Sequence, residues 1–203
     1  MRLLNTLALQ VKKLTEKMNY ESITVRPLTP AIGAEITGVS LATDLPDTTI
    51  AEIRQAWLEH LVVFFRDQTM TPENLVNFSR RFGDIGYYPF VKGMDEYPEV
   101  VEVAKKPDET INFGGLWHTD TSYLESPPLG SVLHAKEVPA VGGDTLFANM
   151  YLAYDSLSDG MKNLLNGLCA VNSSEKPDAA VTRVHRIADR PNDATDITTT
   201  VSH

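Results

Sequence analysis

His118 and Asp120, in the stretch LWHTD, are the residues whose types and spacing are best suited to chemistry. Residues two apart in a β-strand project to the same face, so a strand here would bring the imidazole and the carboxylate together. These groups are two of the three ligands in the 2-His-1-carboxylate set that holds Fe(II). We therefore predict that they bind a metal ion. The alternative is a core histidine held by its neighbouring carboxylate, because an H-x-D spacing alone has low specificity.

Short strands and amphipathic helices are the elements expected to position this pair. Runs of β-branched residues broken by proline and glycine predict strands and turns between residues 23 and 39. Thr49 and Glu52 form a capping-box signature before apolar residues at helical spacing. This pattern predicts a helix that leads into a buried strand at 61–65. Thr71, which is followed by a proline, marks the start of a second helix.

The second half of the chain is expected to add strands and two helices. Alternating apolar residues predict strands at 99–104 and 130–138. The glycine pair at 142–143 permits a tight turn that leads into another strand. Further helices are predicted to begin at Asn149 and Ser158, whose side chains can cap the first turn.

Length and charge restrict the class of protein. A chain of 203 residues, 42% hydrophobic and 22% charged, can bury the core of one globular domain. A net charge of -9 argues against nucleic acid and anionic membrane surfaces, which attract clustered positive charge. We therefore expect a small-molecule partner.

The remaining features concern location and chain organisation. Cys169 is the only cysteine, which fits a reducing, cytoplasmic location, and its apolar neighbours predict a core position. No run approaches the roughly 18 apolar residues of a membrane span. Residues 1–20 are expected to form a helical extension to a domain at 21–203. Within that domain, the polar segment from Ser173 to the end is expected to be an excursion or lid.

A continuous run from Leu116 to Ser158 resembles the taurine dioxygenase family of Fe(II)- and 2-oxoglutarate-dependent oxygenases, which includes the 2,4-dichlorophenoxyacetate dioxygenases. Residues 26–41 and 60–86 resemble the N-terminal region of the same family, in the same order. The resemblance implies an α+β, mainly β fold. This fold is the double-stranded β-helix, or jelly roll, with helices packed outside it.

The resemblance also assigns residues to the metal and the cosubstrate. It makes His118 and Asp120 the first two Fe(II) ligands. Thr145, in GGDTLF, matches a threonine whose hydroxyl binds a carboxylate of 2-oxoglutarate, and Phe147 matches an aromatic wall of that pocket. We expect both to share one strand face. The alternatives are an ordinary strand threonine and a core phenylalanine.

Three residues are candidates for substrate binding. Tyr88 follows FGDIG, where sulfonate-specific members of the family carry a histidine, and Asn112 lies near the position of their asparagine. Thr121 directly follows the H-x-D motif. The differences at these positions argue against taurine itself as the substrate.

The family's third ligand, a second histidine, and its 2-oxoglutarate-binding arginine lie farther along than this sequence extends. The final TTTVSH resembles the region where the segment containing them begins, so His203 is not expected to be the ligand. The sequence therefore predicts an incomplete jelly roll at 21–203, without its C-terminal strands.

The function implied is hydroxylation of a small anionic molecule, with decarboxylation of 2-oxoglutarate to succinate and consumption of O₂. The substrate would be a sulfonate, a sulfate ester or an aryloxy acid, and the resemblance favours a homo-oligomer. One alternative is a non-catalytic fragment that acts as the partner of an intact homologue. Another is a cupin-like metal protein of other chemistry.

Overall fold

The computed structural model describes residues 20–105, 114–175 and 198–202. The chain divides into two compact units. The first consists of Met1–Thr69 and Val138–Asp155, and the second consists of Met70–Glu137 and Ser156–His203. Apart from its last residue, the predicted helical extension at 1–20 lies outside the described residues.

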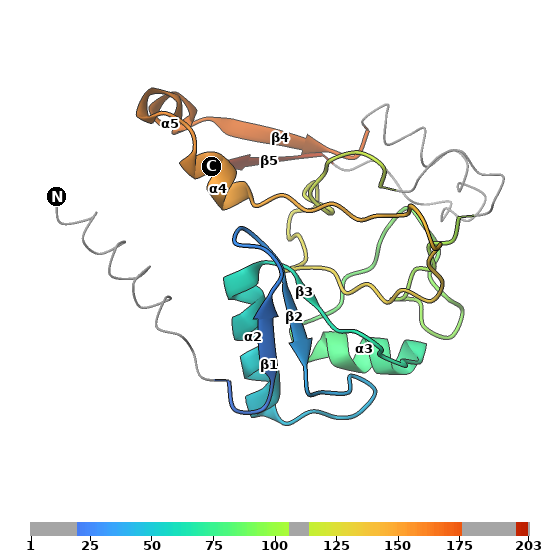
Figure 1. Cartoon of the computed structure of the whole chain (residues 1–203). Coiled ribbons are helices and arrows are strands. Elements are labelled where there is room, and N and C mark those ends of the chain that lie inside the picture. The colour runs from blue at the N-terminus through green and yellow to red at the C-terminus, as the bar shows by residue number, and fades with distance from the viewer. Residues whose placement is uncertain (1–19, 106–113, 176–197, 203) are drawn as a thin grey trace. The chain divides into compact units, whose positions relative to one another are not determined.

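A three-stranded sheet forms the centre of the first unit (Figure 1). Its strands are β1 (Thr24–Pro27), β2 (Ala34–Thr37) and β3 (Val63–Phe64), in that order. β1 pairs antiparallel with β2, and β2 pairs parallel with β3. A hydrogen bond of 2.9 Å from the Leu28 amide to the Gly33 carbonyl closes the turn between β1 and β2. The strands predicted at 23–39 and 61–65 are confirmed, although β3 is half-buried and not buried as predicted.

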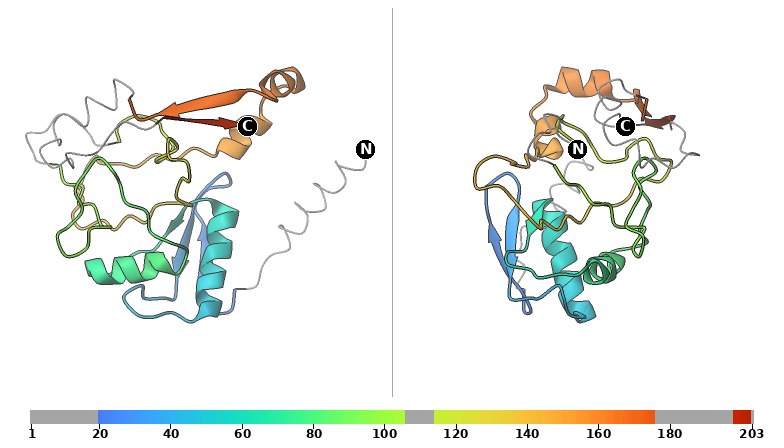
Figure 2. Two further views of the ribbon diagram at one scale, coloured as in Figure 1. Left: turned by 180° about the vertical axis from the view of Figure 1, so that it is seen from behind. Right: turned by 90° about the vertical axis from the view of Figure 1, so that its right-hand side faces the viewer.

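Helix α2 (Asp47–His60) covers one face of this sheet, as the views in Figures 1 and 2 agree. The predicted helix is confirmed, but its predicted capping box is wrong. The helix begins at Asp47, with Pro46 as an N-cap that makes no side-chain hydrogen bond, and Thr49 is buried inside the first turn. The first amides of α2 therefore gain nothing from the Thr49 hydroxyl, and Glu52 is left for another contact.

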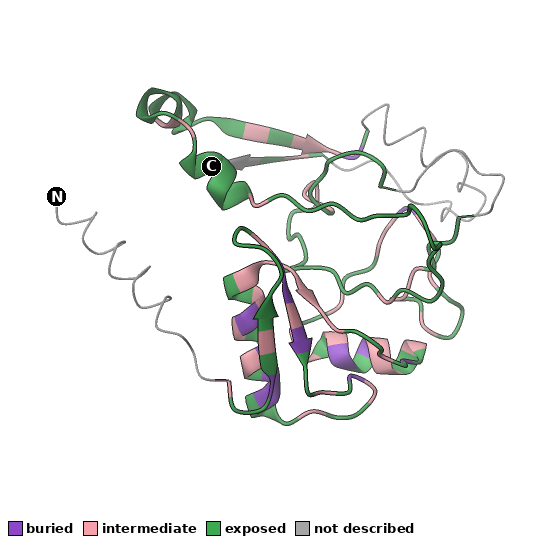
Figure 3. Ribbon diagram, in the orientation of Figure 1, coloured by how far each residue is buried: buried purple, intermediate pink, exposed green. Residues whose placement is uncertain are grey.

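The core of the first unit lies between β2 and α2. Ala34 and Ile36 of β2, and Ile53 and Ala56 of α2, are each exposed by 1% or less. Figure 3 shows the same concentration of buried residues on these two elements. Burial of one such isoleucine side chain contributes about 1.5 to 3 kcal/mol, so this contact is a principal source of stability for the unit.

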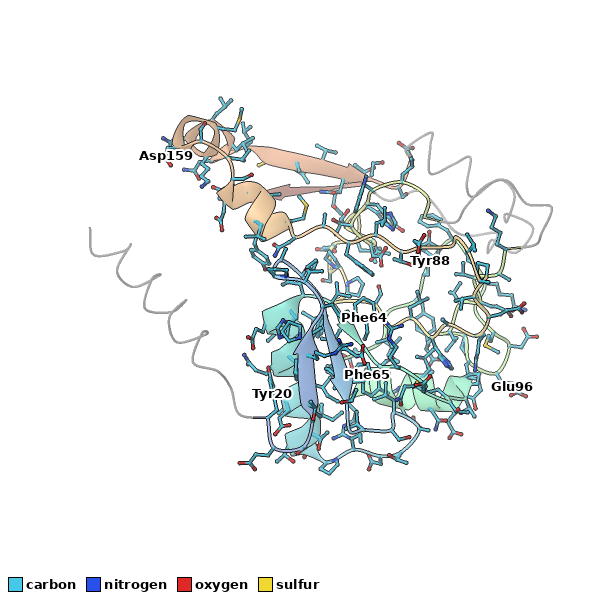
Figure 4. The ribbon with its side chains drawn as sticks, viewed as in Figure 1. Tyr20, Phe64, Phe65, Tyr88, Glu96 and Asp159 are labelled. Carbon is cyan, nitrogen blue, oxygen red and sulfur yellow. The ribbon has the colours of Figure 1, made fainter. Side chains whose placement is uncertain are left out.

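The Glu52 carboxylate attaches the chain before β1 to α2. It accepts hydrogen bonds from the backbone amides of Glu21, at 2.9 Å, and Ser22, at 3.0 Å. Beside it, the Tyr20 hydroxyl donates to Glu59 Oε2 at 3.2 Å; Tyr20 is labelled in Figure 4. The entry to the first strand is therefore held by two acidic side chains of one helix.

The first unit also contains α4 (Met150–Asp155), which begins where the sequence predicts it. Asn149 accepts a hydrogen bond from the Leu152 amide at 3.0 Å and so supplies the first turn with a side-chain partner. Every residue of α4 is exposed (Figure 3).

The second unit contains two helices with side-chain caps. Helix α3 (Pro72–Arg80) follows Thr71, which exchanges hydrogen bonds with Asn74 in a complete capping box. Helix α5 (Asp159–Leu165) follows Ser158, whose hydroxyl accepts from the Met161 amide at 3.2 Å. Both predicted helix starts are confirmed.

A two-stranded antiparallel sheet completes the second unit. It pairs β4 (Cys169–Ser173) with β5 (Thr198–Ser202). Within the segment predicted as an excursion or lid after Ser173, residues 198–202 are paired with β4, and most of the rest lies outside the described residues. The predicted core position of Cys169 is also wrong, because its side chain is exposed at the start of a strand that pairs with one neighbour.

The strands predicted at 99–104, at 130–138 and after the glycine pair at 142–143 are wrong. These segments have no regular structure, although their apolar residues alternate. Alternation favours a strand only where a second strand is present to pair with it. Within the described ranges the strands form two small sheets and no closed barrel.

Ionisation of Tyr20 should destabilise the fold. Burial, followed by the Glu59 and Glu52 charges, raises the pKa of Tyr20 from 10.0 to about 12. The folded state therefore keeps the phenol proton at a pH where the unfolded state has lost it. This contribution to stability is complete below pH 10 and is lost between pH 10 and 12.

The free energy of unfolding is measured by urea denaturation at several pH values from roughly 9 to 11.5, a range that begins below the predicted loss of stability and extends well into it. In Tyr20→Phe, the free energy of unfolding should decline less as the pH rises. Tyr87→Phe, at a tyrosine that is 63% exposed, is the matched control and should decline as the wild type does. Equal pH dependence in the wild type and Tyr20→Phe would contradict the prediction.

Candidate metal site

His118 and Asp120 meet in an irregular segment that leads into a turn, not in a strand. Residues 117–119 have no regular secondary structure, so the strand predicted for this motif is wrong. The turn begins at Asp120, and Thr121 takes a left-handed φ of 47°. A hydrogen bond of 2.9 Å from the Leu124 amide to the Thr121 carbonyl closes it. The imidazole and the carboxylate therefore meet at the start of this turn.

The two side chains meet at a short distance. His118 Nε2 lies 3.0 Å from Asp120 Oδ1, and the side chains are 52% and 57% exposed. The other ring nitrogen, Nδ1, lies 2.6 Å from the Leu116 carbonyl oxygen. Because a carbonyl only accepts hydrogen bonds, Nδ1 must carry the proton in this contact. Nε2 is then the nitrogen available to bind a metal ion or a second proton.

Asp120 is held in turn through its second oxygen. The Ser131 hydroxyl donates to Asp120 Oδ2 at 2.8 Å. Oδ1 and Oδ2 therefore have different partners, the imidazole and a hydroxyl. Metal-binding histidines commonly donate their second N–H to a carbonyl, and metal-binding carboxylates are commonly hydrogen-bonded themselves. The contacts to Leu116 and Ser131 follow this pattern.

The donor set of the pair fits a divalent cation. With Nδ1 protonated, a neutral His118 directs its Nε2 lone pair at the carboxylate of Asp120, and the two repel unless a positive charge accompanies them. A proton on Nε2 or a metal ion can supply that charge. Imidazole and carboxylate together suit Fe(II). Among the residues that the structure describes, no group of three histidine, cysteine, aspartate or glutamate side chains could hold a metal.

Gly114 lies against the imidazole. A Cβ atom at this position would stand 3.2 Å from His118 Cε1, and the backbone has a φ of +68°. A side chain here would therefore both strain the backbone and press on the His118 ring. Glycine leaves the ring the space for its present orientation.

The predicted cosubstrate residues lie in the first unit, whereas the His118–Asp120 pair lies in the second. No turn is assigned at 142–143 itself, although both glycines have positive φ, of 80° and 74°. The strand face predicted for Thr145 and Phe147 is wrong, because their segment is irregular. Their roles toward 2-oxoglutarate stay predictions.

Two contacts fix this cosubstrate segment to the sheet of the first unit. The Phe147 ring, 47% exposed, packs edge to face on Phe64 of β3 with 6.1 Å between ring centroids. Phe64 is labelled in Figure 4. Two residues farther on, Asn149 Nδ2 donates to the Ala31 carbonyl at 2.6 Å. The segment that follows Thr145 is therefore attached to the sheet of the first unit.

Tyr88 is connected through aromatic contacts to the segment that follows the pair. Its ring meets Phe90 at 5.7 Å, and Phe90 in turn meets Tyr123 at 5.8 Å. Phe90 is 2% exposed, so it is the packed centre of this cluster. Figure 4 labels Tyr88. The Oγ1 atom of Thr121 is buried and has no hydrogen-bond partner. Asn112, the third predicted substrate residue, lies outside the described residues.

The comparison with protein families gives a match over most of the chain. A family model described as the taurine catabolism dioxygenase TauD, TfdA family matches residues 24–200. The chain is 34% identical over 169 residues to an alpha-ketoglutarate-dependent sulfate ester dioxygenase of Pseudomonas putida. It is 35% identical over 152 residues to an (S)-phenoxypropionate/alpha-ketoglutarate-dioxygenase of Sphingobium herbicidovorans.

These alignments cover 80% and 73% of this chain and 55% and 53% of the two relatives. The chain thus spans about half the length of the curated relatives it matches.

Solved structures of the same kind share the fold. A taurine dioxygenase from Burkholderia xenovorans matches with a TM-score of 0.63 and 38% identity, over 74% of this chain and 53% of that one. AAD-2, in complex with Mn(II) and N-oxalylglycine, matches with a TM-score of 0.67 and 25% identity, over 79% of this chain and 62% of that one.

Gly114→Ala should displace the His118 ring. The substitution also forces alanine into a left-handed conformation, which costs about 1 to 2 kcal/mol. Gly167→Ala is the matched control, because Gly167 has a φ of +86° and a Cβ added there would have no neighbouring atom within 4 Å. Both variants should unfold at similarly lower urea concentration, but only Gly114→Ala should shift the His118 ring signals in NMR spectra. Unchanged His118 signals in Gly114→Ala would show that the contact is unimportant.

Proposed function

Because the chain belongs to the taurine catabolism dioxygenase family, we propose that it supplies the first two metal ligands of an Fe(II)- and 2-oxoglutarate-dependent dioxygenase. Enzymes of this family depend on Fe(II) and 2-oxoglutarate. The observation that carries the proposal is the approach of His118 Nε2 and Asp120 Oδ1 to 3.0 Å, in the motif whose resemblance assigns them to iron. We also propose that residues 21–203 form part of a domain with the jelly-roll fold of the family.

Each proposed ligand offers one atom to the metal. His118 would bind through Nε2, since Nδ1 donates to the Leu116 carbonyl, and Asp120 would bind through Oδ1. Bound iron supplies coordination of 2-oxoglutarate and O₂ and the oxidising power for hydroxylation. The protein's part is to orient these two atoms. Their exposure leaves access for small molecules.

Thr145 and Phe147 are proposed to bind the cosubstrate. The threonine hydroxyl would donate to a carboxylate of 2-oxoglutarate, and the phenylalanine ring would border the pocket. Support for this proposal comes from the GGDTLF resemblance, the positive φ of both glycines at 142–143, and the attachment of the segment through Phe64.

The proposed substrate is a small organic anion, namely a sulfonate, a sulfate ester or an aryloxy acid. The names of the relatives include a sulfate ester dioxygenase and a phenoxypropionate dioxygenase, and one further relative is named a sulfonate dioxygenase. Tyr88, Asn112 and Thr121 are the proposed substrate-binding residues. Homo-oligomer formation and a cytoplasmic location stay predictions. The described helices include none long and apolar enough to cross a membrane.

Succinate release should depend on the metal pair. The protein is incubated with Fe(II), 2-oxoglutarate and each member of a panel of alkyl sulfates, sulfonates and aryloxyacetates, and the rate of succinate release is measured. Loss of a metal ligand in His118→Ala or Asp120→Ala should lower the substrate-dependent rate by more than about 100-fold, beyond the loss typical for a residue that only supports a ligand. His60→Ala, at the half-buried last residue of α2, is the control and should retain the rate. An unchanged rate in His118→Ala would refute the assignment.

Thr145→Ala should weaken 2-oxoglutarate binding while Thr145→Ser preserves it. A hydrogen bond to a charged group contributes about 1.5 to 3 kcal/mol, which corresponds to a roughly 10- to 150-fold rise in the dissociation constant. The constant is measured by titration with 2-oxoglutarate under anaerobic conditions. A value for Thr145→Ala equal to that of the wild type would remove Thr145 from the cosubstrate site.

A further inference from the structure

The two oxygens of Asp120 are held by different partners. Oδ1 lies 3.0 Å from His118 Nε2, and Oδ2 accepts a hydrogen bond of 2.8 Å from the Ser131 hydroxyl. Among the described residues, these are the polar partners of this carboxylate. Because the Asp120 side chain is 57% exposed, packing does little to restrict its rotation. Its orientation therefore depends on these two contacts.

The direction of the Ser131 hydrogen bond follows from the chemistry of the groups. A carboxylate has only acceptor atoms, so the serine hydroxyl must donate its proton to Oδ2. That contact uses the oxygen farther from the imidazole and leaves Oδ1 beside Nε2. On the other side of the pair, the Leu116 carbonyl holds His118 through Nδ1 in the same manner. Each side chain is thus held by the atom that faces away from the other.

We infer that Ser131 is a positioning residue for the metal site, and this inference rests on the proposed function. Ser131 acts through Asp120, fixing the carboxylate so that Oδ1, next to His118 Nε2, is presented to the cation. It enters from eleven residues farther along the chain, so the contact also ties together the two ends of the segment 120–131. A carboxylate without this hydrogen bond rotates, and less of the population presents Oδ1 correctly. Metal affinity then falls without any change in the ligands themselves.

The test measures Mn²⁺ binding to the 203-residue chain and requires no turnover. Mn²⁺ is added stepwise, and the selective paramagnetic broadening of the His118 ring signals gives an apparent dissociation constant even for weak binding. Ser131→Ala should raise this constant by about 10- to 100-fold, as is typical for loss of a residue that supports a metal ligand. Ser131→Thr retains the hydroxyl and should restore most of the affinity.

A matched control separates positioning from stability. Ser79, in α3 of the same unit, donates its hydroxyl to the Leu75 carbonyl within its own helix, at 2.7 Å. Ser79→Ala therefore loses a comparable hydrogen bond and should keep the wild-type Mn²⁺ constant. The urea midpoint should be similar in all of these variants. A loss of Mn²⁺ affinity in Ser131→Ala that only follows a lower urea midpoint would contradict the positioning role.

The remaining outcomes distinguish the inference from the proposed function. If the His118 signals broaden in the wild type and not in Asp120→Ala, but Ser131→Ala equals the wild type, the metal pair stands and the role of Ser131 is overturned. If Ser131→Thr is as weak as Ser131→Ala, the hydroxyl is not the active feature and the inference fails. If Mn²⁺ does not broaden the His118 signals selectively in the wild type, the metal pair is wrong and the inference falls with it.

Discussion

The approach of two electron-pair donors is the constraint on which the rest of the site depends. His118 Nε2 and Asp120 Oδ1 lie 3.0 Å apart. With Nδ1 protonated, this distance is favourable only when a proton on Nε2 or a metal ion supplies a positive charge. Nδ1 is engaged by the Leu116 carbonyl and Oδ2 by the Ser131 hydroxyl, so neither side chain can simply turn its other atom to the contact. The Leu116 carbonyl and the Ser131 hydroxyl therefore hold the two groups in an arrangement suited to a cation.

The proposed cosubstrate segment has a different kind of support. It is joined to the best-packed part of the first unit, where Ile36 and Ile53 lie fully enclosed between β2 and α2. Phe147 packs on Phe64 of the neighbouring strand, and Asn149 donates to a carbonyl of the loop between β1 and β2. Loops that carry functional groups are commonly positioned by a rigid scaffold of this type. The proposed metal pair instead relies on hydrogen bonds to the Leu116 carbonyl and from the Ser131 hydroxyl.

Local signals in the sequence were sufficient for the helices and insufficient for the later strands. The Thr71 cap and the helical spacing after Asp47 act over a few residues, so they could be read directly. The alternation at 130–138 predicted a strand wrongly, because a strand also needs a pairing partner elsewhere in the chain, which local spacing does not reveal. The spacing of His118 and Asp120 correctly implied proximity, although the segment that carries them is irregular and not a strand. The contact of Ser131 with Asp120 spans eleven residues, and no spacing rule marks it.

The distribution of buried residues makes the two halves of the chain unequal in their resistance to opening. The buried apolar side chains of the described residues end at Phe90, whereas His118, Asp120 and Ser131 all lie beyond it. Segments with few buried apolar contacts open at low free energy, so their amides exchange with solvent early. A cation that binds only the closed form adds its binding free energy to the closing equilibrium. A bound metal ion would then stabilise the folded conformation of this loop. Amide hydrogen exchange around His118 and Asp120 would become slower when the metal binds.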